Sequence, residues 1–161
     1  MARTTARPAR TAPHGAGGGS VSYRHLYRTQ AMERIRLITE GVRAEDAKKW
    51  LEIASLGRNA TLAALDLPVA TFNKKVKAGG RLSQAESERV IGFARLVGQV
   101  EAMMEDAGGP TEFDARAWLA GWLTSPVPAL GGARPIDLMG TMEGQGLVSQ
   151  TLAQIGSGAY A

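Results

Sequence analysis

Residues 81–109, "RLSQAESERVIGFARLVGQVEAMMEDAGG", predict one long helix. Ser83 and Glu86 have the spacing of a capping box, in which each side chain accepts a hydrogen bond from the other residue's backbone N–H. The apolar residues that follow at helical spacing are Val90, Phe93, Leu96, Val97, Val100, Met103 and Met104. The Gly-Gly-Pro run at 108–110 ends this pattern. We therefore expect a helix over residues 84–106, a length of about six turns.

The chain before this helix predicts four shorter helices separated by glycine and proline turns. Their expected ranges are residues 30–39, 44–55, 59–65 and 69–78. The first of them carries Met32, Ile35 and Ile38 at helical spacing. A turn at residues 66–68 precedes the fourth, because the residue before Pro68 avoids the helical region.

The chain after the long helix predicts three more helical pieces around a rigid corner. A short helix is expected at 114–123, one helical turn at 135–139 and a last helix at 143–155. Trp118 and Trp122 could stack on a nucleic-acid base, but tryptophans one helical turn apart are more often core residues, and we interpret them as core. Since no segment has a convincing strand pattern, the predicted fold class is all-α.

Residues 1–28 are rich in Arg, Thr, Ala, Pro and Gly, and hold five arginines and no acid. Such a segment buries too little apolar surface to offset chain entropy, so we predict a disordered basic tail. This segment lacks an apolar h-region, so it is not a secretory signal. An organelle transit peptide would have a similar composition, but a disordered basic tail is favoured over a transit peptide. The tail could add contacts to DNA phosphates or the minor groove, or have no function. No apolar run approaches the roughly 18 residues of a membrane span, so we expect a cytoplasmic protein without a membrane partner.

The residue types argue against an enzyme. The absence of cysteine excludes disulfides and thiolate metal sites. His14 and His25, the only histidines, both lie in the predicted tail, which argues against a histidine-based catalytic or zinc site in the folded part. Glu101 and Glu105 share a helix face, but that spacing is ordinary for a solvated surface. We therefore expect no catalytic residue, no metal and no cofactor.

Residues 59–78 have the layout of a helix-turn-helix whose second helix has a basic outer face. Residues 58–81 hold five basic side chains against one acid. The predicted DNA-binding residues are Thr71, Asn73 and Lys74, for base edges, and Lys75, Lys77 and Arg81, for phosphates. A lysine-rich face can also be merely solvated. The turn, the concentrated charge and the basic tail together favour DNA as the partner.

Residues 82–161 hold nine acids against four bases, which suggests a protein partner with a basic face or pocket. Two runs in this half, "RLSQAESERV" and "WLTSPVPALGGARPIDLMGTMEGQGLVSQTLAQIGSGAY", carry a recognisable pattern. Its residues are Arg81, Leu82, Ser83, Glu86, Ser87, Arg89, Trp122, Leu123, Pro126, Leu130, Gly131, Gly132, Pro135, Leu138, Thr141, Gly144, Val148, Leu152, Ile155 and Gly158. This pattern resembles the C-terminal domain of the Xre/MbcA/ParS antitoxin family. The "SPVPAL" loop and the long basic tail depart from it.

The resemblance implies an antitoxin of a RES–Xre type II toxin–antitoxin system. Its Xre-like helix-turn-helix bundle would repress the operon promoter. A small helical C-terminal domain would cover the active site of a RES-domain toxin. Such a toxin degrades NAD or transfers its ADP-ribose. The expected domains are a tail at 1–28, a DNA-binding domain at 29–81 and a toxin-binding domain at 82–161. Palindromic operator DNA would require a homodimer within a larger toxin–antitoxin complex.

The residues expected to contact the toxin are Arg134, Asp137, Leu147, Gln150, Gln154, Tyr160 and Ala161. Tyr160 and the terminal carboxylate could enter a pocket of the toxin, or the end of the chain could be disordered; the sequence leaves both open. It also leaves open a stand-alone transcriptional regulator whose acidic half dimerises or senses a signal.

Overall fold

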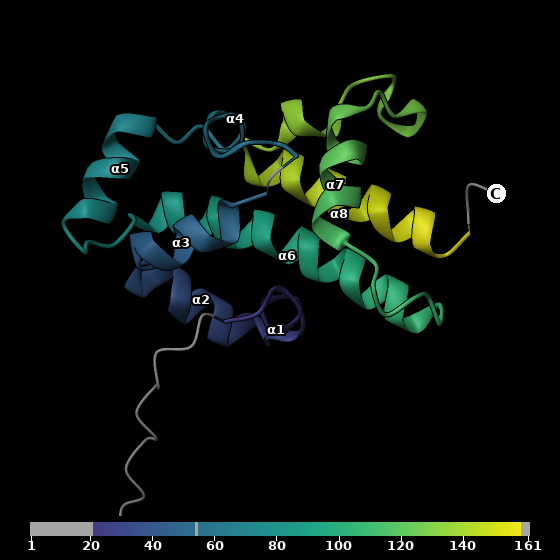
Figure 1. The fold of residues 1–161 in the computed structure, drawn as a ribbon, viewed down its shortest axis with the longest axis horizontal. Helices are drawn as coiled ribbons and strands as arrows, with labels where there is room; N and C mark the ends of the chain where they lie inside the picture. The colour runs from purple at the N-terminus through teal and green to yellow at the C-terminus, as the bar shows by residue number, and fades with distance from the viewer. Residues whose placement is uncertain (1–20, 54, 159–161) are drawn as a thin grey trace, which may run out of the picture.

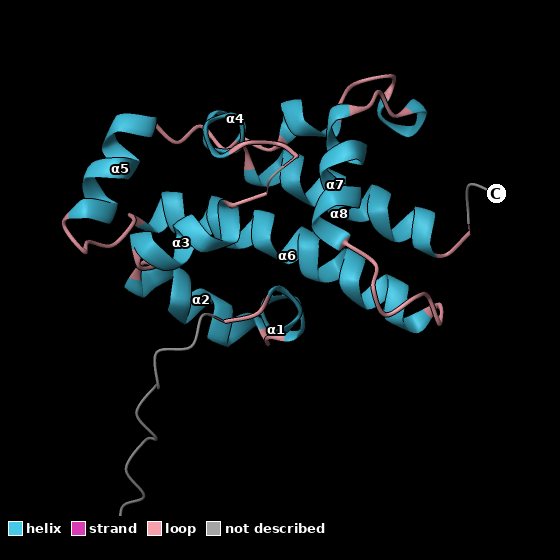
Figure 2. Ribbon diagram, viewed as in Figure 1, coloured by secondary structure: helices cyan, strands magenta, loops and turns pink. Residues whose placement is uncertain are grey.

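The computed structural model describes residues 21–53 and 55–158, and within them the regular elements are all helical (Figures 1 and 2). The front part holds α1 (Tyr23–Arg28), α2 (Ala31–Glu40), α3 (Ala44–Leu51), α4 (Arg58–Ala64) and α5 (Val69–Lys77). The remaining elements are α6 (Gln84–Asp106), α7 (Ala115–Thr124), the 3-10 turns η1 (Pro128–Leu130) and η2 (Pro135–Leu138), and α8 (Met142–Gly156). The all-α prediction is confirmed.

Helix α6 is the central element of the fold. It begins with the predicted capping box: the Ser83 hydroxyl accepts from the Glu86 backbone N–H, and a Glu86 carboxylate oxygen accepts from the Ser83 N–H at 2.6 Å. Both predicted ends of this helix are confirmed. Helices α1, α2 and α3 pack on α6, as do α7 and α8, so it contacts both halves of the chain (Figure 1).

Helix α1 contradicts the prediction of a disordered tail through residue 28. Leu26 is fully buried, and the Tyr23 hydroxyl donates to the Trp50 carbonyl at 3.0 Å. The backbone of α1 lies so close to α6 that a Cβ at Gly98 would collide with the Tyr23 carbonyl oxygen. The prediction of disorder rested on the conformational entropy that an ordered chain loses. Burial of apolar side chains such as Leu26 offsets that loss for residues 21–28. Residues 1–20 lie outside the described part of the chain.

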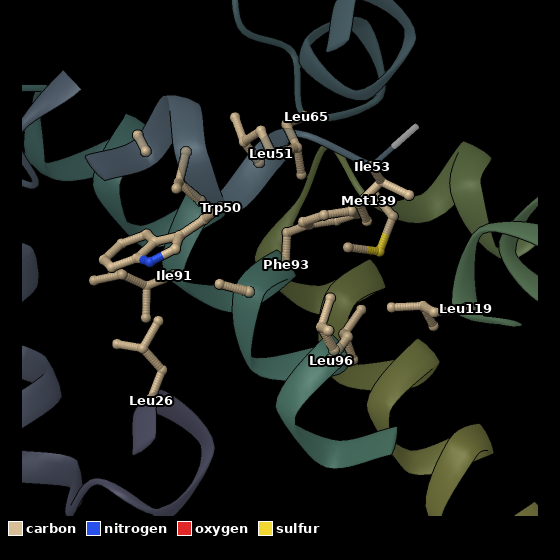
Figure 3. Packing of buried hydrophobic residues seen from close by; sticks show 14 of the residues in the cluster. Leu26, Trp50, Leu51, Ile53, Leu65, Ile91, Phe93, Leu96, Leu119 and Met139 are labelled. Carbon is tan, nitrogen blue, oxygen red and sulfur yellow. The ribbon is translucent and has the colours of Figure 1, made fainter. Parts of the chain in front are cut away.

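The core is one continuous cluster that crosses the predicted domain boundary between residues 81 and 82. Phe93 of α6 points toward Ile53 and Met139, which lie on opposite sides of that boundary in the sequence (Figure 3). Next to the boundary, the Leu82 N–H donates to the Val42 carbonyl at 2.8 Å. The two halves therefore share their packing, and the division at residue 81 stays a prediction.

Helix α2 keeps much of its apolar spacing in solvent. Met32 is 75% exposed and Ile35 is 53% exposed, whereas Leu37 and Ile38 pack against the core. The spacing of apolar residues predicted the helix correctly, but it did not predict which of these side chains would be buried.

Candidate functional site

Helices α4 and α5 form the predicted helix-turn-helix. The turn between them contains Asp66 at a φ of 53°, a left-handed conformation that aspartate tolerates better than most residues. The Leu67 N–H donates to the Leu62 carbonyl at 2.8 Å and closes the end of α4. Pro68 then caps α5, where its fixed φ suits a helix start. Together, Asp66, Leu67 and Pro68 determine the direction of α5 relative to α4.

Phe72 anchors α5 in the core, and Val69 and Val76 pack against the same cluster, as predicted. Thr71, Lys74 and Lys77 are exposed on the outer side, and Asn73 is partly buried. Helix α5 lies at one end of the molecule, far from the C-terminal end of α8 (Figure 1). A duplex contacting α5 would therefore leave the end of α8 accessible.

Two of the predicted phosphate-contacting residues already have partners within the fold. Lys75 donates to Glu86 with 2.5 Å between Nζ and Oε2, and Arg81 donates from Nη1 to the Gly41 carbonyl at 2.6 Å. Partial burial acts to raise the pKa of Glu86, but hydrogen bonds from Lys75 and Ser83 outweigh it, so that pKa is lowered. A phosphate contact by Lys75 would have to compete with this pair.

Sequence reasoning did not identify Arg43 as a neighbour of Arg81, one of the predicted phosphate-contacting residues. An isolated antiparallel bridge pairs Arg43 with Arg81, and the Arg43 side chain is exposed. The two arginines are far apart in the sequence, and only the pairing of two loops brings them together. No periodic pattern could have indicated this neighbour.

Residues 125–135 form a corner after α7 with the 3-10 turn η1 inside it, and one of the two tryptophans before it is not a core residue. The indole rings of Trp118 and Trp122 stack with centroids 6.3 Å apart, and Trp122 packs against the core. Trp118 is 37% exposed, so its interpretation as core is wrong. Gly131 and Gly132 adopt φ angles of 65° and 84°, which reverse the chain where other residues would be strained.

The described residues predicted to contact a toxin lie on η2 and α8. Arg134 and Asp137 pair at 2.9 Å on an exposed surface. On α8, Leu147 is 46% exposed and Gln150 is exposed, whereas Gln154 is partly buried and engaged with other residues. The other two residues predicted to contact the toxin, Tyr160 and Ala161, lie outside the described residues.

An apolar groove of about 330 Å³ runs between the corner and α8. Pro126, Val127 and Pro128 line one side of it, and Thr151 and Ile155 line the other. The sequence predicted a rigid corner between these helical pieces. The groove adds a concave apolar surface next to that helix.

Comparison with known families explains this combination of surfaces. Residues 33–95 match the antitoxin Xre-like helix-turn-helix domain, and residues 111–158 match the antitoxin Xre/MbcA/ParS C-terminal toxin-binding domain. The chain belongs to the Xre/MbcA/ParS antitoxin family. The antitoxin is also similar to the Prs ADP-ribosylating antitoxin of Sphingobium sp. (strain YBL2), with 48% identity over 147 residues that cover 91% of this chain and 92% of that protein.

The two matches divide the predicted site residues of the antitoxin between them. The helix-turn-helix match contains all six predicted DNA-binding residues, and it extends well into α6. The toxin-binding match contains the five described residues predicted to contact the toxin and ends before Tyr160. Among the described residues, no helix is long and apolar enough to cross a bilayer, and no group of His, Asp and Glu could hold a metal ion.

Proposed function

We propose that this antitoxin binds a RES-domain toxin that degrades NAD or transfers its ADP-ribose, and neutralises it by covering the toxin's active site. The match of residues 111–158 to a toxin-binding domain is the observation that carries this proposal. The name of the Sphingobium relative, which refers to ADP-ribosylation, supports this class of toxin. We propose no reaction for the antitoxin itself.

The proposed contact surface combines the outer face of α8 with the corner. Leu147 and Gln150 offer an exposed apolar and an exposed polar side chain one turn apart. The groove beside Pro126–Pro128 offers a concave apolar surface of the kind that a partner side chain fills. The acidic charge of residues 82–161 complements a cleft that binds the anionic pyrophosphate of NAD.

The front half is proposed to bind operator DNA and repress the antitoxin's own operon. Lys74 and Lys77 are exposed cations on the second helix of the helix-turn-helix, and neither has an ion-pair partner within the described residues. A helix in this position contacts the major groove. A two-fold symmetric operator would be bound by a homodimer.

Co-expression with the product of the adjacent toxin gene tests the proposal. We expect the two proteins to copurify. We also expect NAD consumption by the purified toxin to fall as antitoxin is added and to stop at a fixed molar ratio of antitoxin to toxin. A second assay measures binding of the promoter fragment to the antitoxin. If the promoter is bound but the toxin neither copurifies nor is inhibited, the protein is a stand-alone regulator instead.

A further inference from the structure

The start of α3 lies beside the loop that follows α5, and backbone contacts hold the two together (Figure 1). Arg43 and Arg81 form the isolated antiparallel bridge between them. Next to it, the Ala44 N–H donates to the Gly80 carbonyl at 2.9 Å, and the Gly80 N–H donates to the Lys75 carbonyl of α5 at 2.9 Å. Arg43 is therefore fixed close to the end of the second helix of the helix-turn-helix.

The exposed arginines of the described residues fall into two groups. Those that pair with carboxylates are Arg28, Arg36, Arg116 and Arg134. Arg43 and Arg81 pair with no carboxylate within residues 21–53 and 55–158. The two exposed arginines that lack an acidic partner in the described chain are thus the two that the bridge brings together.

Arg43 has the freer side chain of these two. The Arg81 Nη1 donates to a backbone carbonyl of the facing loop at 2.6 Å, whereas the Arg43 side chain makes no hydrogen bond within the described residues. Among the acids near it in the sequence, Glu40 and Asp46 pair with other cations, and Glu45 makes no ion pair in the described structure. The guanidinium of Arg43 can therefore bind an anion without breaking a contact of the fold.

We propose that Arg43 contacts a phosphate of the DNA duplex that α5 binds. This inference rests on the proposed DNA-binding function of α5. Residues directly opposite each other in an antiparallel pair carry their side chains on the same face, so Arg43 and Arg81 place two positive charges side by side. A guanidinium binds phosphate oxygens through paired N–H donors. A toxin with a basic cleft would be repelled by the same two charges, which favours DNA as the partner.

This contact would give the antitoxin a second point of attachment to DNA. The helix α5 would lie in the major groove, while Arg43 of the neighbouring loop would bind the sugar–phosphate backbone beside it. Phosphate contacts fix the orientation of a protein on the duplex and carry no sequence information directly. The effect of Arg43 on binding should therefore be the same for every DNA sequence.

Fluorescence anisotropy of Arg43→Gln tests this contact on the promoter fragment and on an unrelated duplex, each at several salt concentrations. We expect the Kd to rise about threefold to tenfold for both duplexes, and the salt dependence to fall by about one unit. The Tm should match that of the natural sequence, because the bridge is formed by the backbone and the Arg43 side chain makes no hydrogen bond within the described residues.

Two further variants are the controls. Arg43→Lys keeps the positive charge and should keep the salt dependence of the natural sequence. Lys48→Gln removes one positive charge from α3, and Lys48 likewise makes no ion pair in the described structure. Its promoter affinity should be close to that of the natural sequence.

The possible failures of this inference and of the proposed DNA binding are distinguishable. If replacing Lys74 and Lys77 weakens promoter binding but Arg43→Gln changes neither affinity nor salt dependence, the inference is wrong and the DNA-binding function stands. If the natural sequence does not bind the promoter, both are wrong. A lower Tm with an unchanged salt dependence would make Arg43 a structural residue. Weaker toxin binding with normal promoter binding would place the contact on the toxin, and either result overturns the inference.

Discussion

Lys75 and Glu86 join the second helix of the helix-turn-helix to the first turn of α6, with 2.5 Å between Nζ and Oε2. The same carboxylate oxygen also accepts from the Ser83 backbone N–H at 2.6 Å. One glutamate therefore caps the central helix and holds the end of α5. This pair adds a polar contact between α5 and α6 to the packing of Phe72 in the core.

Glu86→Gln is expected to lower the free energy of unfolding by about 1 kcal/mol, because glutamine can still cap α6 but cannot pair its charge with Lys75. The folded-state pKa of Glu86 lies below its ordinary value of 4.5, so the stabilisation is fully present above about that pH. It is lost as the pH falls through the lower, folded-state pKa. Urea unfolding from neutral pH to pH 3 measures this difference.

Glu88→Gln is the matched control, since Glu88 lies on the same helix and makes no ion pair in the described structure. Its stability should differ little from that of the natural sequence at any pH. If Glu86→Gln and Glu88→Gln show the same pH dependence, the Lys75 pair does not stabilise the fold.

The sequence predicted α6 because its signals are local: a capping box at one end, two glycines and a proline at the other, and apolar spacing between. Helix α1 was missed because its stability comes from contacts with Trp50 and Gly98, which are distant in the sequence. The pairing of Arg43 with Arg81 was equally invisible, since it joins two loops that are distant in the sequence.

The close approach of α1 to α6 predicts a large effect of Gly98→Ala. The added methyl group would collide with the Tyr23 carbonyl, and neither backbone can move freely in a packed core. We expect a loss of about 1–3 kcal/mol in the free energy of unfolding. Hydrogen exchange should show that the amides of α1 lose more protection than those of α7.

Gly121→Ala is the control for helix propensity. Gly121 lies inside α7, and a Cβ there would meet nothing within 4 Å. This change should stabilise the protein by about 0.5–1 kcal/mol, because alanine loses less backbone entropy in a helix. Equal effects of the two substitutions would show that α1 does not depend on the glycine at position 98.

Promoter binding should depend more on Lys74 and Lys77 than on Lys75. Replacing Lys74 and Lys77 by alanine should weaken binding and reduce the salt dependence by about one unit for each lysine that contacts a phosphate. Lys75→Ala should have a smaller effect, because Glu86 already neutralises that charge. Fluorescence anisotropy on a promoter fragment at several salt concentrations measures both quantities.

Lys48→Ala removes one charge from α3 and serves as the control for each single α5 substitution, since Lys48 makes no ion pair in the described structure. It should change promoter affinity less than Lys74→Ala or Lys77→Ala does. Unchanged affinity and salt slope in the Lys74/Lys77 variant would show that α5 is not the DNA-contacting helix.

Toxin binding should fail when the outer face of α8 is made acidic. Leu147 is 46% exposed, so Leu147→Asp should leave the fold intact while it buries a charge in the proposed interface. We expect at least a tenfold rise in the Kd for the toxin, with a Tm close to that of the natural sequence. Ala85→Asp places the same charge on an exposed position in the first turn of α6, outside the toxin-binding match, and should bind the toxin normally. Calorimetric titration of each variant into purified toxin distinguishes them, and normal binding by Leu147→Asp would move the interface away from this face.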